Sequence, residues 1–228
     1  MSATKFPSEI NEHTAKLIVG LIAITLAIAE YFLTCRELHS VSESYLFDGW
    51  ARNVFVGSLC AIGAFMFSYN GKEPFQTFQM IMSKVAALAA LGIAMFPCLC
   101  NRNPDDLDFP YVHGISTLIL FIILILFCYF FFKRAWGKYL KARAKGESGW
   151  APKTRAGIYL ACGGLIFASM VLLAIDKMLD DVISKQVPNL TFYCEYVALS
   201  SFGVAWLIAG GHVLPGKIKA MLKRYGLI

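Results

Sequence analysis

The sequence predicts an all-α, polytopic membrane protein, and three observations support this. Apolar residues make up 57% of the 228 residues, and the mean hydropathy is +0.59. Charged residues make up only 16%, against about 25% in a typical soluble domain. The apolar residues also form continuous blocks, and a helix needs about 20 of them to cross the hydrocarbon core. The strands of a membrane barrel would instead alternate apolar and polar residues.

Six blocks are long enough to span a membrane, and together they predict a transmembrane helical bundle that forms a single membrane domain over residues 1–228. They lie at residues 17–34, 52–70, 80–100, 113–132, 156–175 and 192–213. The first block resembles a signal peptide, but it is longer than the roughly 7–15 apolar residues of such a leader. Glu9 and Glu12 also precede it. We therefore expect a first span and not a cleaved leader.

The distribution of charge predicts the orientation, because cytoplasmic loops carry the excess of Lys and Arg. With both termini in the cytoplasm, 16 of the 21 Lys and Arg residues lie inside, and 11 of the 15 acidic residues lie outside. The sequence therefore predicts a multi-pass protein of the cell inner (plasma) membrane with cytoplasmic N- and C-termini. This asymmetry explains the net charge of +6, so we expect no nucleic-acid partner.

Two basic segments on the inner side predict contact with membrane lipids. Residues 133–155 hold eight cations interleaved with Trp136, Tyr139 and Trp150, and residues 217–224 have the same character. This pattern is typical of a helix lying on an anionic inner leaflet, where each cation contributes about 1 kcal/mol. A plain topology anchor and a partner-protein site are the alternatives.

Side-chain size distinguishes the spans from one another. Small residues at four-residue spacing, which let helices approach closely, are Ala86, Ala90 and Ala94 in the third span, Gly57 and Ala61 in the second, and Ala205 and Ala209 in the sixth. The fourth span is large and apolar all round, so we expect it to face lipid or a second protomer. A homo-oligomer formed through this span is one hypothesis.

Ionisable residues within spans are rare and indicate function by default. Five of the six spans carry such a residue near the outer boundary, which predicts an outward-facing polar pocket. Its expected ligand-binding residues are Glu30, Arg52, His113 and Glu195, with Ser42, Ser44 and Asp48 in the covering loop. Arg52 would pair with the carboxylates or hold a phosphate by paired hydrogen bonds. The alternative is that these residues only contact water and lipid head groups at the interface.

Two stretches carry a resemblance to known proteins. One contains Ser42-Glu43-Ser44-Tyr45, then Arg52-Asn53-Val54-Phe55-Val56-Gly57, and the other contains Glu195-Tyr196-Val197-Ala198 with Phe202-Gly203-Val204-Ala205-Trp206-Leu207. Together they resemble uncharacterised bacterial six-span inner-membrane proteins, and they are weakly similar to the DRAM-like (autophagy-modulator) membrane superfamily. Ser42, Ser44, Arg52 and Phe55 match its element before and into the second span. The resemblance implies a link to lipid remodelling and no catalytic signature.

Catalytic motifs are missing from the sequence. There is no GxSxG elbow, no Gly-rich phosphate loop and no HExxH motif. His39 and His113 fall outside, whereas His13 and His212 fall inside, so three histidines cannot meet around zinc on one face. We therefore expect neither a metal nor a cofactor.

The leading functional hypothesis is that the outer pocket binds or senses a lipid or small amphiphile. One alternative is a membrane-embedded hydrolase that uses His113 with Glu195, and another is an oligomeric channel or transporter subunit. Four cysteines lie near the outer face, namely Cys35, Cys98, Cys100 and Cys194. They either pack as free thiols or form one disulfide in an oxidising compartment.

Overall fold

The computed structural model describes residues 12–34, 38–99, 109 and 111–211. This part of the chain contains six helices that are long and apolar enough to cross a membrane, and it contains no strand. They are α1 (Glu12–Thr34), α2 (Trp50–Ser68), α3 (Gln76–Met95), α4 (Val112–Ala144), α5 (Trp150–Met178) and α7 (Leu190–Ala209). The 3₁₀-helix η1 (Val41–Leu46) and the short helix α6 (Val182–Gln186) lie between them. The prediction of an all-α, six-span, multi-pass membrane protein is confirmed.

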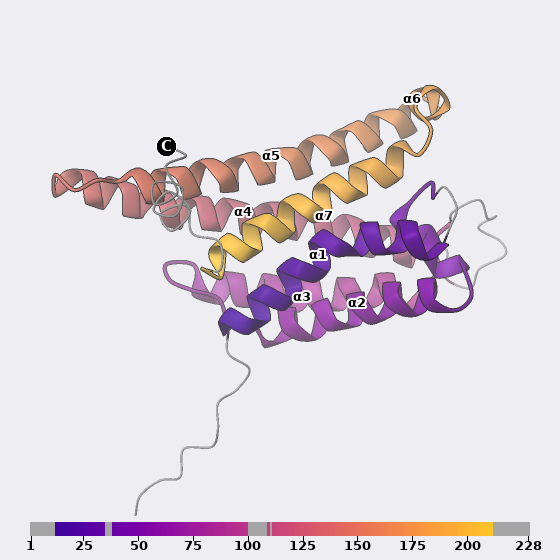
Figure 1. Cartoon of the computed structure of the whole chain (residues 1–228), viewed down its shortest axis with the longest axis horizontal. Coiled ribbons are helices and arrows are strands. Elements are labelled where there is room, and N and C mark those ends of the chain that lie inside the picture. The colour runs from indigo at the N-terminus through magenta and orange to yellow at the C-terminus, as the bar shows by residue number, and fades with distance from the viewer. Residues whose placement is uncertain (1–11, 35–37, 100–108, 110, 212–228) are drawn as a thin grey trace, which may run out of the picture.

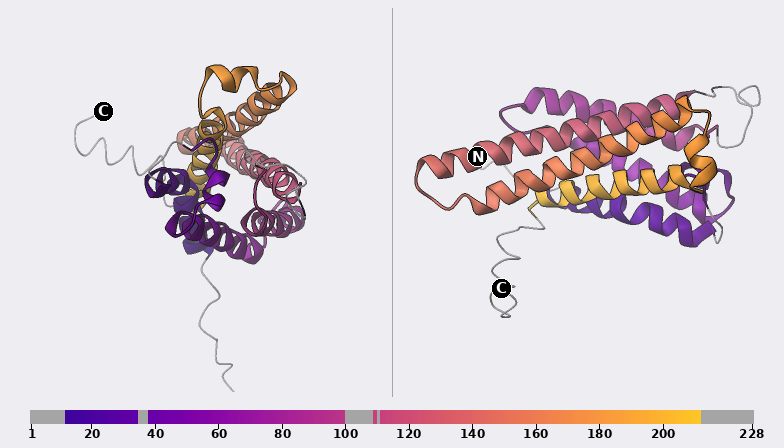
Figure 2. Two further views of the ribbon diagram at one scale, coloured as in Figure 1. Left: turned by 90° about the vertical axis from the view of Figure 1, so that its right-hand side faces the viewer. Right: turned by 90° about the horizontal axis from the view of Figure 1, so that it is seen from above.

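The helices run up and down, and each packs on the next in sequence, while α7 returns to pack on α1, α5 and α4 (Figures 1 and 2). As a result, 61% of the apolar window of α7 is buried, against 17% for α5. We call the end with the α2–α3 and α4–α5 connections the basic end. The opposite end, with η1 and α6, is the acidic end. The helix that faces the surroundings most is therefore α5, and α7 is the centre of the bundle.

The contact between α1 and α7 depends on two glycines. A Cβ at Gly203 would lie 2.7 Å from the backbone oxygen of Gly20, and a Cβ at Gly20 would lie 2.7 Å from the side chain of Leu207. The two backbones therefore approach more closely than any larger residue allows. The predicted stripe of small residues in α3 is buried as expected, whereas Gly57 of α2 has no neighbour within 4 Å of its Cβ position.

Aromatic rings fill the centre of the bundle on the basic side. Trp206 of α7 is 2% exposed, and its ring centroid lies 5.1–5.6 Å from those of Tyr69, Phe127, Phe131 and Phe202. Rings at such separations add to the stability that apolar burial provides. The cluster joins α7 to α4 and to the end of α2.

The structure differs from the prediction between residues 133 and 155. The expected helix on the leaflet surface is absent, because α4 continues unbroken to Ala144 and α5 begins at Trp150. α4 ends just before Gly146, which has a left-handed backbone at φ +70°, and Lys141 and Arg143 favour the negative end of the helix dipole. At 1.5 Å per residue, α4 is about 50 Å long, well beyond the roughly 30 Å of hydrocarbon. Figure 1 shows this α4–α5 hairpin extending past the other helices.

The end of α3 and the exposure of α4 also differ from the prediction. α3 ends at Met95 and not at residue 100, because Pro97 disfavours helix for the residue before it. α4 is not exposed all round: it packs against α5, α3 and α7, and 44% of its window is buried. The apolar side chains that made this span look peripheral therefore belong partly to the core.

Candidate functional site

At the acidic end, Glu195 binds the segment that links α1 to α2. The carboxylate accepts hydrogen bonds from the Ser40 hydroxyl at 2.8 Å and from the Val41 amide at 2.6 Å. The Ser40 oxygen in turn accepts a bond from the Ser42 amide at 3.1 Å, which caps η1. All four residues are buried. Glu195 therefore fastens η1 to the start of α7.

Glu30 lies under the same 3₁₀-helix. Its side chain is fully buried, and it lies near the hydroxyl of Ser44, which is also fully buried. Neither the carboxyl oxygens of Glu30 nor the Ser44 hydroxyl oxygen make a hydrogen bond of normal geometry. An uncompensated polar group in such surroundings is costly. Glu30 is thus the least satisfied polar side chain at this end of the described chain.

Arg52 does not pair with the buried carboxylates as expected. Its Nε donates to the Tyr45 carbonyl at 2.7 Å, and its guanidinium lies 5.1 Å from the Tyr45 ring centroid. Its ionic partner is Asp48, at 3.8 Å, whose side chain is 99% exposed. Arg52 lies in the first turn of α2, four residues after Asp48. Its ion pair with Asp48 is therefore a local contact on the exposed surface of the protein. Arg52 and Asp48 therefore line no shared pocket with Glu30.

His113 connects a different pair of elements. Its Nδ1 lies 2.8 Å from the carbonyl oxygen of Phe96, and its side chain is 5% exposed. This bond joins the start of α4 to the end of α3. Among the described contacts, His113 has none with Glu195, and no group of three or more His, Cys, Asp or Glu in the described residues is suited to a metal ion.

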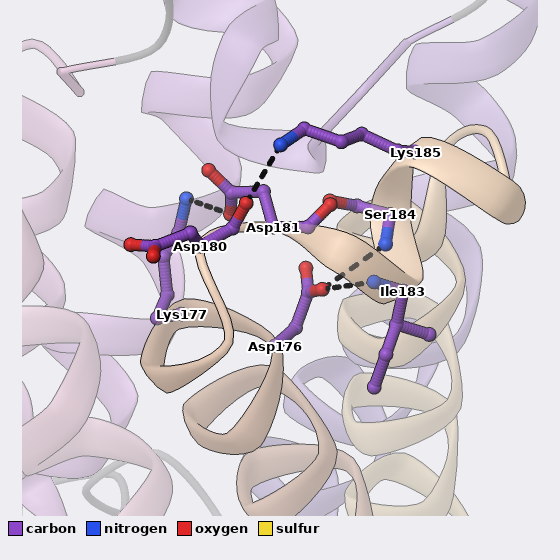
Figure 3. A network of polar contacts seen from close by, with 7 residues as sticks. All are labelled: Asp176, Lys177, Asp180, Asp181, Ile183, Ser184 and Lys185. Atoms are coloured by element: carbon purple, nitrogen blue, oxygen red, sulfur yellow. Dashed lines mark hydrogen bonds and ion pairs between the residues drawn. The ribbon is translucent and has the colours of Figure 1, made fainter.

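Asp176 has a local structural role, which Figure 3 shows. Its Oδ1 accepts bonds from the amides of Ile183 at 2.8 Å and Ser184 at 3.0 Å. Nearby, Lys177 pairs with Asp181 at 2.7 Å, and Lys185 donates to the backbone oxygen of Asp180 at 2.8 Å. Asp176 therefore holds α6 over the end of α5, and both lysines bond within the same turn.

The cysteines follow one of the two expected arrangements. Cys98 is disulfide-bonded, whereas Cys194 is free. Cys35 and Cys100 lie outside the described residues, as do His212 and the basic segment 217–224. The side chain of His13 is likewise outside the described part.

The structure therefore brings together only some of the residues expected in an outer pocket. Those gathered around η1 are Glu30, Ser42, Ser44 and Glu195, whereas Arg52, Asp48 and His113 bind elsewhere. Glu195 and Ser42 take part in the hydrogen bonds that join η1 to α7 and cap η1, and Ser44 is fully buried within η1. The arrangement is well suited to holding the α1–α2 connection against α7.

The basic end contains a cavity of about 470 Å³, which we call the basic pocket. Seven cationic side chains line it: Lys133, Arg134, Lys138 and Lys141 from α4, Arg155 from α5, Lys16 from α1 and Lys72 from the α2–α3 connection. Glu73 is the one acidic residue among the described residues that line it. The volume falls within the range of roughly 300–1,000 Å³ typical of ligand pockets.

The positive charges that α4 and α5 contribute to the pocket are not compensated within the described residues. Within the described residues, the five cations of α4 and α5 have no carboxylate partner within ion-pair distance. The Nε of Arg155 is buried and has no hydrogen-bond acceptor. Lys16 is 2% exposed, with its ammonium 5.0 Å from the ring centroid of Tyr69. A cavity lined by one sign of charge concentrates ions of the opposite sign, so the basic pocket is arranged to take an anion.

Aromatic and apolar side chains close the inner wall of the basic pocket. Phe131, Tyr159 and Ile208 line it and are 2%, 5% and 4% exposed. Phe131 also contacts Trp206, so the wall belongs to the aromatic cluster. The cations therefore surround an opening whose floor is closely packed.

Sequence reasoning identified the basic segment but not this pocket. The 133–155 segment was expected to lie on a leaflet, so its cations were not grouped with Lys16 of α1 or Lys72 of the α2–α3 connection. The signal that was available is the spacing of Arg134, Lys138 and Lys141, which places three cations on one helical face.

Comparison with known proteins adds no relative. No protein-family model matches the chain, and neither the curated proteins nor the solved structures include a significant match. The resemblance to the DRAM-like superfamily therefore stays a prediction from the sequence.

Proposed function

We propose that this multi-pass membrane protein binds an anionic lipid or amphiphile through the basic pocket. The observation that carries the proposal is a cavity of about 470 Å³ whose described lining includes five cations of α4 and α5 without a carboxylate partner. Like charges held together repel one another, and an anion between them relieves that repulsion. The lipid partner expected from the sequence is kept, but its site moves from the outer end to the basic end.

The orientation of the chain supports a lipid ligand. The excess of Lys and Arg supports an orientation with the basic end at the cytoplasmic face of an inner or plasma membrane. The disulfide of Cys98 is at the acidic end, and disulfides persist in oxidising compartments. Both features favour the same orientation, which puts the basic pocket at the anionic leaflet.

The test compares two double charge reversals in the full-length protein in neutral detergent. Lys138→Glu/Lys141→Glu changes the pocket, and Lys145→Glu/Lys153→Glu makes the same charge change on exposed residues of the same hairpin that do not line the pocket. Native mass spectrometry with added phosphatidylglycerol counts bound lipids, with phosphatidylcholine as the neutral comparison.

We expect the pocket variant to bind phosphatidylglycerol at least about tenfold more weakly than the control variant, because charge-assisted hydrogen bonds each contribute around 1.5–3 kcal/mol. Equal weakening in both variants would mean that general surface charge attracts the lipid, and it would refute the proposal. Thermal unfolding of both variants checks that the fold is kept.

A second candidate keeps a ligand at the acidic end. It is favoured by the buried oxygens of Glu30 and Ser44, which lack hydrogen-bond partners. A small amphiphile with a hydrogen-bond donor would satisfy them. If so, Glu30→Leu abolishes co-purification of a bound molecule that Arg52→Ala retains. Retention of that molecule by Glu30→Leu would remove this candidate.

A further inference from the structure

The charge of the basic pocket restricts which anions it accepts, given the anion-binding function proposed for it. Among the described lining residues, the five cations of α4 and α5 face a single carboxylate, that of Glu73, and leave an excess of positive charge. A phosphodiester head group carries a single negative charge, so most of the excess would persist after it binds. A ligand with several negative charges gains more from the same pocket.

The spacing of the cations on α4 indicates the length of the charged group. Arg134, Lys138 and Lys141 lie on one face of the helix, and all three line the pocket. At 1.5 Å per residue, they extend over about 10 Å along the helix axis. One phosphate group is shorter than this row, whereas two linked phosphates contact more of it at once.

Arg155 faces the row from α5 and differs from the lysines around it. Its Nε is buried and lacks an acceptor, so a residue that lines the pocket has an unsatisfied donor. A guanidinium holds a phosphate by two parallel hydrogen bonds, which a lysine ammonium does not reproduce. Arg155 is therefore suited to hold one phosphate while the α4 row contacts the next.

We propose that the basic pocket binds a diphosphate group and that Arg155 recognises one of its two phosphates. The packed wall of Phe131, Tyr159 and Ile208 leaves no path for a long chain into the bundle. The apolar part of a lipid ligand then stays in the leaflet beside the helices. The diphosphate is the shared chemistry of two sources, a membrane isoprenoid diphosphate and free pyrophosphate.

Two matched pairs of compounds test this with the full-length protein in neutral detergent. Farnesyl diphosphate is compared with farnesyl monophosphate, and pyrophosphate with inorganic phosphate, by isothermal titration calorimetry. We expect the farnesyl diphosphate to bind at least about tenfold more tightly than the monophosphate, because further charge-assisted bonds form. Tight binding of pyrophosphate as well would identify the free anion as sufficient, and binding of the farnesyl compound alone would identify a lipid source.

The outcomes separate this inference from the proposed function. Equal affinity for monophosphate and diphosphate would overturn the diphosphate assignment and leave anion binding intact. Absence of binding by all four compounds, together with equal phosphatidylglycerol binding by the two charge-reversed variants, would overturn both.

Arg155→Lys tests the recognition residue, and Arg143→Lys is the control, because Arg143 is exposed on the same hairpin and does not line the pocket. Both variants keep the charge and lose the guanidinium fork. We expect Arg155→Lys to reduce the preference for diphosphate over monophosphate at least threefold and Arg143→Lys to leave it unchanged. A full preference in Arg155→Lys, with a normal unfolding temperature, would refute the role of Arg155.

Discussion

Gly203→Ala tests whether the close approach of α1 and α7 holds the bundle together. The added Cβ would lie 2.7 Å from the backbone oxygen of Gly20, whereas ordinary contacts begin at 3.4 Å. One helix therefore has to move by about 0.7 Å, and overpacking of this kind costs roughly 1–3 kcal/mol. Alanine returns about 0.5–1 kcal/mol through its higher helix propensity. We expect a net loss of about 1–2 kcal/mol, or a fall of roughly 2–8 °C in Tm.

The matched control is Gly57→Ala, at a helical glycine of α2 whose Cβ position has no neighbour within 4 Å. There the helix propensity acts alone, so we expect Tm to stay the same or to rise slightly. Thermal unfolding of both variants in the same detergent measures the difference. If Gly203→Ala proves as stable as Gly57→Ala, the two backbones are not in tight contact, and the packing account is wrong.

Three further substitutions test the acidic end. Glu195→Ala leaves the buried Val41 amide and Ser40 hydroxyl without an acceptor, at a cost of about 1–3 kcal/mol each. We therefore expect a lower Tm and faster hydrogen exchange over residues 38–46. Unchanged exchange would contradict the contact between Glu195 and this segment. Asp176→Ala removes the acceptor of two α6 amides, so exchange should rise over residues 182–186 while the global Tm falls little; a large fall in Tm would show that the effect is not local. Arg52→Ala breaks an exposed ion pair worth about 0–1 kcal/mol and one hydrogen bond to the Tyr45 carbonyl, so Tm should fall by less than it does in Glu195→Ala, and an equal fall would assign Arg52 a larger role.

The six spans followed from hydropathy because a membrane helix satisfies every backbone group internally, so length and apolar content suffice. The same reasoning misplaced the 133–155 segment. Its cations and aromatic residues are typical both of a helix on a leaflet and of a helix that continues into water. The packing of α4 against α5 decides between these two arrangements, and the sequence of one helix alone does not predict that contact.

The candidate site was less predictable than the fold, because burial and pairing depend on contacts between distant residues. Glu195 was singled out correctly as a polar residue within a span, but its partners, Ser40 and Val41, lie about 155 positions away in sequence. Arg52 was expected to pair with carboxylates on other helices, and it found Asp48 four residues before it. Lys16 and Arg155 lie on different helices, so no local pattern places them around one cavity.

The turn at the tip of the α4–α5 hairpin divides the molecule into two separable halves. Residues 145–148 are exposed, and exposed loop tips tolerate cleavage and insertion. A cut there separates α1–α4 from α5–α7, yet the halves share the contacts of α4 with α5 and of α1 with α7. The basic pocket lies across this division, with its lysines in one half and Arg155 in the other. Two co-expressed fragments that reassemble would therefore complete the pocket, which neither fragment forms by itself.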